Sequence, residues 1–343
     1  MRDKPELRDA AIMSALSTNY GIDATGIEYL SLGYDFDAWV YRVDMGGEAP
    51  YFLKLKRKIE DDGMLAVPHY LREHGVAQVV APIATPSGDL WSNVDRFAAI
   101  LYPFVDGRNG REFGLSPSQW EEFGAILRAI HGTRLPPEIA QRLPREAFIP
   151  NHRYATSVRK ILDGTYERMP QDEFSGELTA FLHSRLDDIE RILRRAEDLG
   201  RALRQRPWDF VLCHADIHVA NVLLDHQDRV VIIDWDQPIF APKERDLMFV
   251  MGPALRGFLA GSPEESGFFS GYGHAEVDPV ALAYYRYEWA VQDIGSYAES
   301  VYQPRDPGEK SRRTAMDTIR LVFEPGDEVE AAFRSENDLP AGV

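Results

Sequence analysis

The chain has 343 residues, of which 38 are basic and 55 acidic, and its formal net charge is −17. Such a surface repels nucleic acid and anionic membranes, so neither is expected as a partner, and it attracts cationic small molecules. The single cysteine, Cys213, excludes an internal disulfide framework and fits a cytoplasmic location.

Strand-like patterns dominate the first part of the chain. The runs 39–41 and 51–53 are rich in strand formers and are separated by the turn sequence "DMGGEAP". They predict a hairpin preceded by a loop around Gly33. The other elements expected in this part are a helix over 7–20, a helix over about 61–74, and strands near 78–84 and 96–102.

Helical patterns dominate the second part. Apolar residues at helical spacing predict helices over 117–131, 174–205 and 279–302, and short apolar runs lie at 210–213 and 230–233. A β-rich part followed by a mainly helical part indicates an α+β protein with two lobes. We place the boundary in the connector "LYPFVDG", which gives a lobe over 1–103 and a lobe over 104–343.

Two acidic clusters follow one another in this second part. Asp216 precedes Asn221 by five positions in "HADIHVAN", and Asp234 ends the apolar run of "RVVIIDWD". Phosphoryl transfer needs a carboxylate for the attacking hydroxyl, and an amide oxygen and a second carboxylate for magnesium. The same chemistry needs a lysine on a strand to reach the phosphates, and Lys54 ends the run "YFLK".

The stretch "VLCHADIHVANVLLDHQDRVVIIDWDQPIFAPKERDLMFV", residues 211–250, resembles the aminoglycoside phosphotransferase family. The resemblance extends over nearly the whole chain, with the motifs in the same order. It implies a bilobal protein-kinase-like fold with a small β-rich N-terminal lobe and a larger, mainly helical C-terminal lobe. It also implies ATP as phosphate donor, with GTP as an alternative, and Mg²⁺ as cofactor.

The family's functional residues match individual positions of this chain. By resemblance, Asp216 is the catalytic base, and Asn221 and Asp234 are the magnesium ligands. The implied nucleotide-binding residues are Lys54 on the phosphates, Gly33 in the covering loop, Val40 over the adenine ring, and the Pro103 carbonyl and Val105 amide at the adenine edge.

The chain departs from the family pattern in two places. In the covering loop "LGYDFDAWVYRV", only Gly33 and the small Ala38 match a kinase glycine loop. The family also places a helix glutamate against the phosphate lysine, but His69 stands at the expected position. Glu73 and Glu60 are possible substitutes. Lys56 is an alternative phosphate lysine, because it shares a strand face with Lys54.

The acceptor is expected to be a small molecule. His218 stands where a protein-serine kinase of this fold carries lysine, and the short segment from Asp234 to Asp246 leaves no room for a peptide-binding loop. We expect Arg245 and Asp246 to stabilise the loop by pairing. An alternative is a zinc site in which His214, Asp216 and His218 alternate on a strand.

The segment "YYRYEWAVQDIGSYAES", residues 284–300, is either a core-packed helix or one wall of the acceptor pocket. Its aromatic and acidic side chains suit a ring that bears ammonium groups. The candidate acceptor-binding residues are Asp236, Glu288, Trp289 and Asp293.

The resemblance favours an aminoglycoside or aminocyclitol acceptor such as spectinomycin. The alternatives are a metabolic kinase for an amino alcohol, a sugar or a homoserine-like compound, and a nucleotide-binding pseudokinase that acts as a regulator. The sequence is compatible with a monomer or a homodimer.

Overall fold

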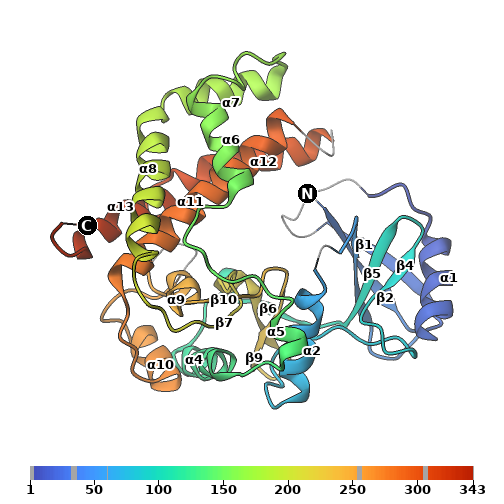
Figure 1. The fold of residues 1–343 in the computed structure, drawn as a ribbon. Coiled ribbons are helices and arrows are strands. Elements are labelled where there is room, and N and C mark those ends of the chain that lie inside the picture. The colour runs from blue at the N-terminus through green and yellow to red at the C-terminus, as the bar shows by residue number, and fades with distance from the viewer. Residues whose placement is uncertain (1–3, 32–36, 60, 253–256, 304–307, 343) are drawn as a thin grey trace.

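The structure is a computed structural model that describes residues 4–31, 37–59, 61–252, 257–303 and 308–342. Gly33 and the other residues of 32–36 in the expected phosphate-covering loop lie outside these ranges. Figure 1 shows a sheet-rich N-terminal part beside a larger helical part. This arrangement confirms the predicted α+β class.

The strands are β1 (Gly26–Leu30), β2 (Ala38–Asp44), β3 (Tyr51–Lys56), β4 (Ser92–Val94), β5 (Phe97–Pro103), β6 (Gly107–Asn109), β7 (Val211–Cys213), β8 (Val222–Asp225), β9 (Val230–Ile232) and β10 (Ile239–Ala241). The helices are α1 (Asp9–Tyr20), α2 (Gly63–Glu73), α3 (Gly110–Phe113), α4 (Pro117–Gly132), α5 (Pro137–Ala140), α6 (His152–Leu162), α7 (Glu173–His183), α8 (Leu186–Leu203), α9 (Glu244–Val250), α10 (Pro263–Tyr272), α11 (Pro279–Tyr302), α12 (Glu309–Val322) and α13 (Glu328–Arg334). Within the described ranges, no helix is both long and apolar enough to cross a membrane.

The N-terminal sheet has two chemically different faces. Its strands are antiparallel in the order β1-β2-β3-β5-β4. Side chains alternate between the faces of a strand, so Tyr41 and Val43 of β2 and Leu53 and Leu55 of β3 pack in one core with α1. The intervening residues face the opposite way, towards the helical part. Val40 and Lys54 are direct cross-strand partners on that second face.

Three expectations from the sequence need correction. Strand β1, at one edge of the sheet, and helices α6, α10, α12 and α13 were not predicted. Residues 78–84 form no strand; Val79 makes a single bridge to Ile232 there. The helix expected over 174–205 is two helices, α7 and α8, and the Ser184 hydroxyl donates to the Phe181 carbonyl at the break. Such side-chain hydrogen bonds compete with helix continuation.

Helix α2 packs with the helical part, although it precedes the expected boundary at residue 103. Val67 and Leu71 of α2 belong to the same core cluster as Leu127 of α4. The chain that follows α2 is also hydrogen-bonded to β9, because the Val80 N–H donates to the Ile232 carbonyl at 2.9 Å. The division of the chain at residue 103 stays a prediction.

Helices α4 and α10 approach so closely that glycine is required where they cross. A Cβ atom at Gly271 would lie 1.9 Å from the Glu121 carbonyl oxygen, and one at Gly124 would lie 2.1 Å from the Phe268 carbonyl oxygen. Both contacts are with backbone, which cannot rotate away as a side chain can. The two helices would have to separate to admit a methyl group.

We predict that Gly271→Ala lowers the free energy of unfolding by about 1–3 kcal/mol, as overpacking does in well-packed cores. Urea unfolding followed by circular dichroism measures this change. Gly176→Ala is the matched control, because Gly176 lies in α7 with no atom within 4 Å of the added Cβ. There alanine should stabilise the helix by roughly 0.5–1 kcal/mol. Equal effects of the two substitutions would contradict the close approach.

Candidate active site

A buried carboxylate holds the loop that carries Asp216. Asp246 of α9 has no exposed surface, and its Oδ2 and Oδ1 accept the backbone N–H groups of His214 and Ala215 at 2.9 and 2.7 Å. His131 Nε2 lies 3.0 Å from the same Oδ2. Burial alone would raise the pKa of Asp246, but its bond to His131 and the other donors hold that pKa below its usual value. This outcome supports the expected structural role of Asp246.

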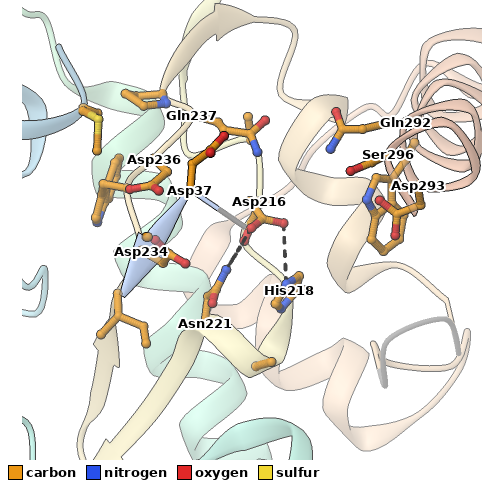
Figure 2. A pocket seen from close by; sticks show the side chains of 18 of the residues that line it. Asp37, Asp216, His218, Asn221, Asp234, Asp236, Gln237, Gln292, Asp293 and Ser296 are labelled. Carbon is orange, nitrogen blue, oxygen red and sulfur yellow. Dashed lines mark hydrogen bonds and ion pairs between the residues drawn. The ribbon is translucent and has the colours of Figure 1, made fainter. Parts of the chain in front are cut away.

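The loop backbone is strained where it turns towards Asp216. Ala215 has φ 68°, a left-handed conformation that costs a residue with a Cβ roughly 1 kcal/mol. The hydrogen bond from the Ala215 N–H to Asp246 holds this turn in place. As a result, the Asp216 side chain projects into the cavity between the two parts of the chain (Figure 2).

Asn221 and His218 surround the Asp216 carboxylate (Figure 2). Asn221 Nδ2 donates to the Asp216 carbonyl at 2.7 Å and to its Oδ2 at 3.2 Å, and His218 Nε2 lies 3.5 Å from Oδ1. Burial raises the pKa of Asp216 and lowers the pKa of His218. Low solvation therefore strengthens Asp216 as a proton acceptor and favours the neutral imidazole.

Asp234 and Asn221 offer oxygen atoms on one side of Asp216. Asp234 follows β9 with φ 64°, and Figure 2 shows it next to Asn221. Because Asn221 donates to Asp216 through Nδ2, its Oδ1 is the atom available to a cation. A carboxylate and an amide oxygen are ligands that suit Mg²⁺, so these residues fit the metal.

Both lysines of β3 point at the loop that follows Asp234. Lys54 Nζ bonds to Asp234 Oδ1 at 2.9 Å and to Asp236 Oδ2 at 2.8 Å, and Lys56 Nζ bonds to the same Asp236 oxygen at 2.6 Å. Burial alone would raise the pKa of Asp236, but the two ammonium groups hold it well below its usual value. Only Lys54 reaches both aspartates, which supports Lys54 as the phosphate lysine.

Among the described residues, Lys54 pairs with Asp234 and Asp236 after β9, and no carboxylate of helix α2 pairs with it. Glu73 points elsewhere: its carboxylate is 3.4 Å from His69 Nε2 and its side chain is 60% exposed. Glu60 lies outside the described residues. Asp236, which the sequence placed among the candidate acceptor-binding residues, forms ion pairs with the two lysines.

One cavity of about 1950 Å³ joins the sheet to the catalytic loop. Leu30, Val40 and Phe52 line it from the sheet, and Leu223 and Ile233 line it from the helical part. These apolar side chains suit the two faces of a flat ring such as adenine. Pro103 and Val105 line the same cavity, at the end of β5 and just beyond it.

Helix α11 forms the wall opposite Asp216. Gln292, Asp293 and Ser296 point into the cavity from this helix (Figure 2). Trp289 also lines the cavity, but it is only 8% exposed. It packs edge-on against Phe249, with 4.8 Å between the two ring centroids. Residues 279–302 therefore combine the two interpretations that the sequence left open, since one side of the helix is core and another is pocket wall.

Glu288 is already paired within the protein. Its Oε2 accepts from Arg245 Nη1 at 3.0 Å, and its Oε1 accepts from the Asn151 N–H at 3.4 Å. These contacts indicate a structural role for Glu288, although it lines the cavity. Sequence reasoning missed Asp327 and Glu328, which line the same cavity at the start of α13. The N-cap aspartate in "GDEVE" indicates that a helix begins there, but the sequence does not show that this helix packs on α11 beside the cavity.

The zinc alternative finds no support in the geometry. His214 Nε2 bonds to the Ile233 carbonyl at 3.0 Å, and its Nδ1 lies 3.3 Å from the Asp216 N–H, so both ring nitrogens are used. A second group, His131, Cys213 and Asp246, has ligand atoms within 4.8 Å of one another. There, burial keeps the Cys213 thiol protonated by raising its pKa, and Asp246 already has three donors.

Comparison with known proteins places this geometry in context. Residues 26–281 match the sequence profile of the "Phosphotransferase enzyme family". A crystal structure of a spectinomycin phosphotransferase with ADP and spectinomycin is similar at 32% identity and a TM-score of 0.85, covering 97% of this chain and 99% of that one. Protein StrN of Streptomyces griseus is 24% identical over 287 residues, covering 80% of this chain and 79% of that protein.

A microcompartment-associated aminopropanol kinase shares the fold at a TM-score of 0.59 and 18% identity, covering 96% of this chain and 98% of that one. Together with the spectinomycin phosphotransferase, it confirms the predicted kinase-like fold.

We predict that Asp246→Asn destabilises the protein by about 1–3 kcal/mol, because an amide N–H₂ would face buried donors in place of one acceptor oxygen. The midpoint of urea unfolding measures this change. Asp209→Asn, at an exposed position just before β7, should leave the midpoint unchanged. An Asp246→Asn protein as stable as the native protein would contradict the role of this carboxylate.

Asp236→Asn should lower the melting temperature, since breaking charged hydrogen bonds costs roughly 1.5–3 kcal/mol. Added ADP should then raise the melting temperature of this variant by more than that of the native protein, because phosphate replaces the lost anion beside Lys54 and Lys56. Thermal unfolding with and without ADP tests both statements. Glu197→Gln, which removes an exposed ion pair with Arg159, is the control. Equal ADP-induced shifts in all three proteins would refute the exchange of anions.

Proposed function

The chain belongs to the phosphotransferase enzyme family, and on that premise we propose that it transfers the γ-phosphate of ATP to a hydroxyl group of an aminocyclitol such as spectinomycin. The observation that carries the proposal is the meeting of Asp216, Asn221 and Asp234 in one cavity, opposite Lys54 of the sheet. The spectinomycin phosphotransferase that is 32% identical over almost the whole chain supports the choice of acceptor.

The proposed reaction uses Asp216 to orient the acceptor hydroxyl and to accept its proton as the oxygen attacks the γ-phosphate in line. Asn221 and Asp234 would hold Mg²⁺, which neutralises charge on the phosphates when it is bound. Lys54 exchanges part of its contact with Asp234 and Asp236 for the phosphates. Val40, Pro103 and Val105 border the proposed adenine site, and the phosphate-covering role of Gly33 is an expectation from the sequence alone.

The charge of the cavity supports a cationic acceptor. Asp293, Asp327 and Glu328 line the cavity from helix α11 and the start of α13 and lie close enough to influence one another's charge. Gln292 and Ser296 add hydrogen-bonding groups on the same wall (Figure 2). An ammonium-bearing ring with several hydroxyl groups matches this combination of carboxylates and neutral polar groups.

We predict that purified protein with ATP and Mg²⁺ releases ADP only when an aminocyclitol is added. A panel of spectinomycin, aminoglycosides, amino alcohols, sugars and homoserine identifies the acceptor class. Turnover with an amino alcohol but not with spectinomycin would replace the proposed acceptor by the metabolic alternative. ATP binding without turnover on any acceptor would favour the regulatory pseudokinase.

Asp216→Ala should lower turnover at least about 10²-fold, as expected for loss of a general base. Asp209→Ala, at an exposed position, is the control and should retain turnover. Full activity of the Asp216→Ala protein would refute the assignment of the base.

A further inference from the structure

Two carboxyl groups from different helices meet in the wall of the cavity where the acceptor is proposed to bind. Asp293 of α11 and Glu328 at the start of α13 form a side-chain hydrogen bond with one another. Both residues line the cavity that contains Asp216. Glu328 is only 6% exposed, and its Oε2 is buried without a hydrogen-bond partner among the described residues. An unsatisfied buried oxygen of this kind favours a donor brought by a ligand.

A hydrogen bond between two carboxyl groups needs a proton, because a carboxylate can only accept. Two ionised carboxylates in contact would repel one another at low local dielectric. The hydrogen bond between Asp293 and Glu328 therefore requires the pair to hold one proton before a cation binds. The pair resembles the shared-proton carboxyl dyads of other enzymes in this respect.

The surrounding charges reinforce this protonation. Burial, together with repulsion from Asp216, Asp327 and Glu288, raises the pKa of Asp293 to about 7, although the hydrogen bond with Glu328 acts in the opposite direction. Burial also raises the pKa of Glu328 well above its usual value. Arg111 of α3 acts in the opposite direction on Glu328.

Three other acids that line the cavity are already paired with basic side chains. Glu288 pairs with Arg245, Asp236 pairs with two lysines, and Glu299 pairs with Arg153 at 2.7 Å. Among the described residues, neither Asp293 nor Glu328 has a salt bridge to a basic side chain. A cationic ligand can therefore pair with these two carboxyl groups without displacing a basic side chain.

We propose that Asp293 and Glu328 share one proton in the empty cavity and release it when an ammonium group of the acceptor enters between them. This inference rests on the proposed function, because it assigns one subsite to an amine of the phosphate acceptor. The pair with its proton carries one negative charge, and the ammonium group adds one positive charge. After binding, one proton has moved to solvent, and two carboxylates hold the cation.

The exchange makes acceptor affinity depend on pH. A protein that must lose a proton to bind its ligand binds more tightly as pH rises through the pKa of the releasing group. The pKa of about 7 for Asp293 places this change near neutral pH. An acceptor whose amine stays charged across this range should therefore bind more weakly at pH 6 than at pH 8.

Isothermal titration of spectinomycin at pH 7, in buffers with different ionisation enthalpies, counts the protons released. We expect about one proton per spectinomycin bound, after correction for the amine's own titration. Glu328→Gln keeps a hydrogen bond to Asp293 but cannot exchange a proton, so release should vanish. KM for spectinomycin should rise about tenfold, as for a lost charged contact, while KM for ATP and kcat stay nearly constant.

Glu299→Gln is the matched control, because it removes a carboxylate that lines the same cavity but is already paired with Arg153. It should keep the proton release and change KM less than about twofold. Asp293→Asn should reproduce the Glu328→Gln result, and this second variant guards against a folding defect in either protein.

The outcomes separate this inference from the proposed function. Turnover of spectinomycin without proton release, and with unchanged KM in both variants, would overturn the subsite and leave the proposed function intact. Proton release on binding that Glu328→Gln abolishes, in the absence of turnover, would support the subsite and overturn the proposed acceptor chemistry. Neither binding nor turnover of spectinomycin would overturn both.

Discussion

The catalytic geometry depends on one buried carboxylate. Asp246 has no contact with water, so its charge is stable only because two backbone N–H groups and an imidazole point at it. The same bonds hold Ala215 in a left-handed conformation that its Cβ disfavours. Asp216 follows directly, and Asn221 is bonded back to it. The burial of Asp246 therefore fixes where Asp216, the proposed proton acceptor, and the proposed metal-binding oxygen of Asn221 lie.

The cavity balances charge differently at its two ends. At the nucleotide end, Lys54 and Lys56 satisfy Asp236 within the protein, so an anionic ligand meets two cations that already have a competing partner. At the acceptor end, Asp293 and Glu328 face one another, and only a proton or a cation relieves their repulsion. At one end the Asp236 carboxylate takes the place of a phosphate, and at the other a proton takes the place of a cation. Without a ligand, the buried charges therefore still have partners.

Local patterns in the sequence predicted most of the fold and the centre of the site. The hairpin, the longer helices and the order of the motifs can be read from residues that are neighbours in the sequence. The spacing between Val40 and Lys54 makes them direct partners across strands β2 and β3. Contacts between distant segments could not be predicted this way. Asp236 meets Lys54 across 182 positions, and Glu328 reaches Asp293 only because α13 packs on α11. The break between α7 and α8 was missed because the sequence there carries neither glycine nor proline.

The placement of α2 has a consequence for how such chains recombine during evolution. Val67 and Leu71 pack in the core of the helical part, and the chain after α2 is hydrogen-bonded to β9. A genetic recombination near residue 103 would exchange the N-terminal sheet together with helix α2, which is part of the core of the helical part. An exchange at this point would therefore need compensating changes on β9 and α4 to keep the shared core packed.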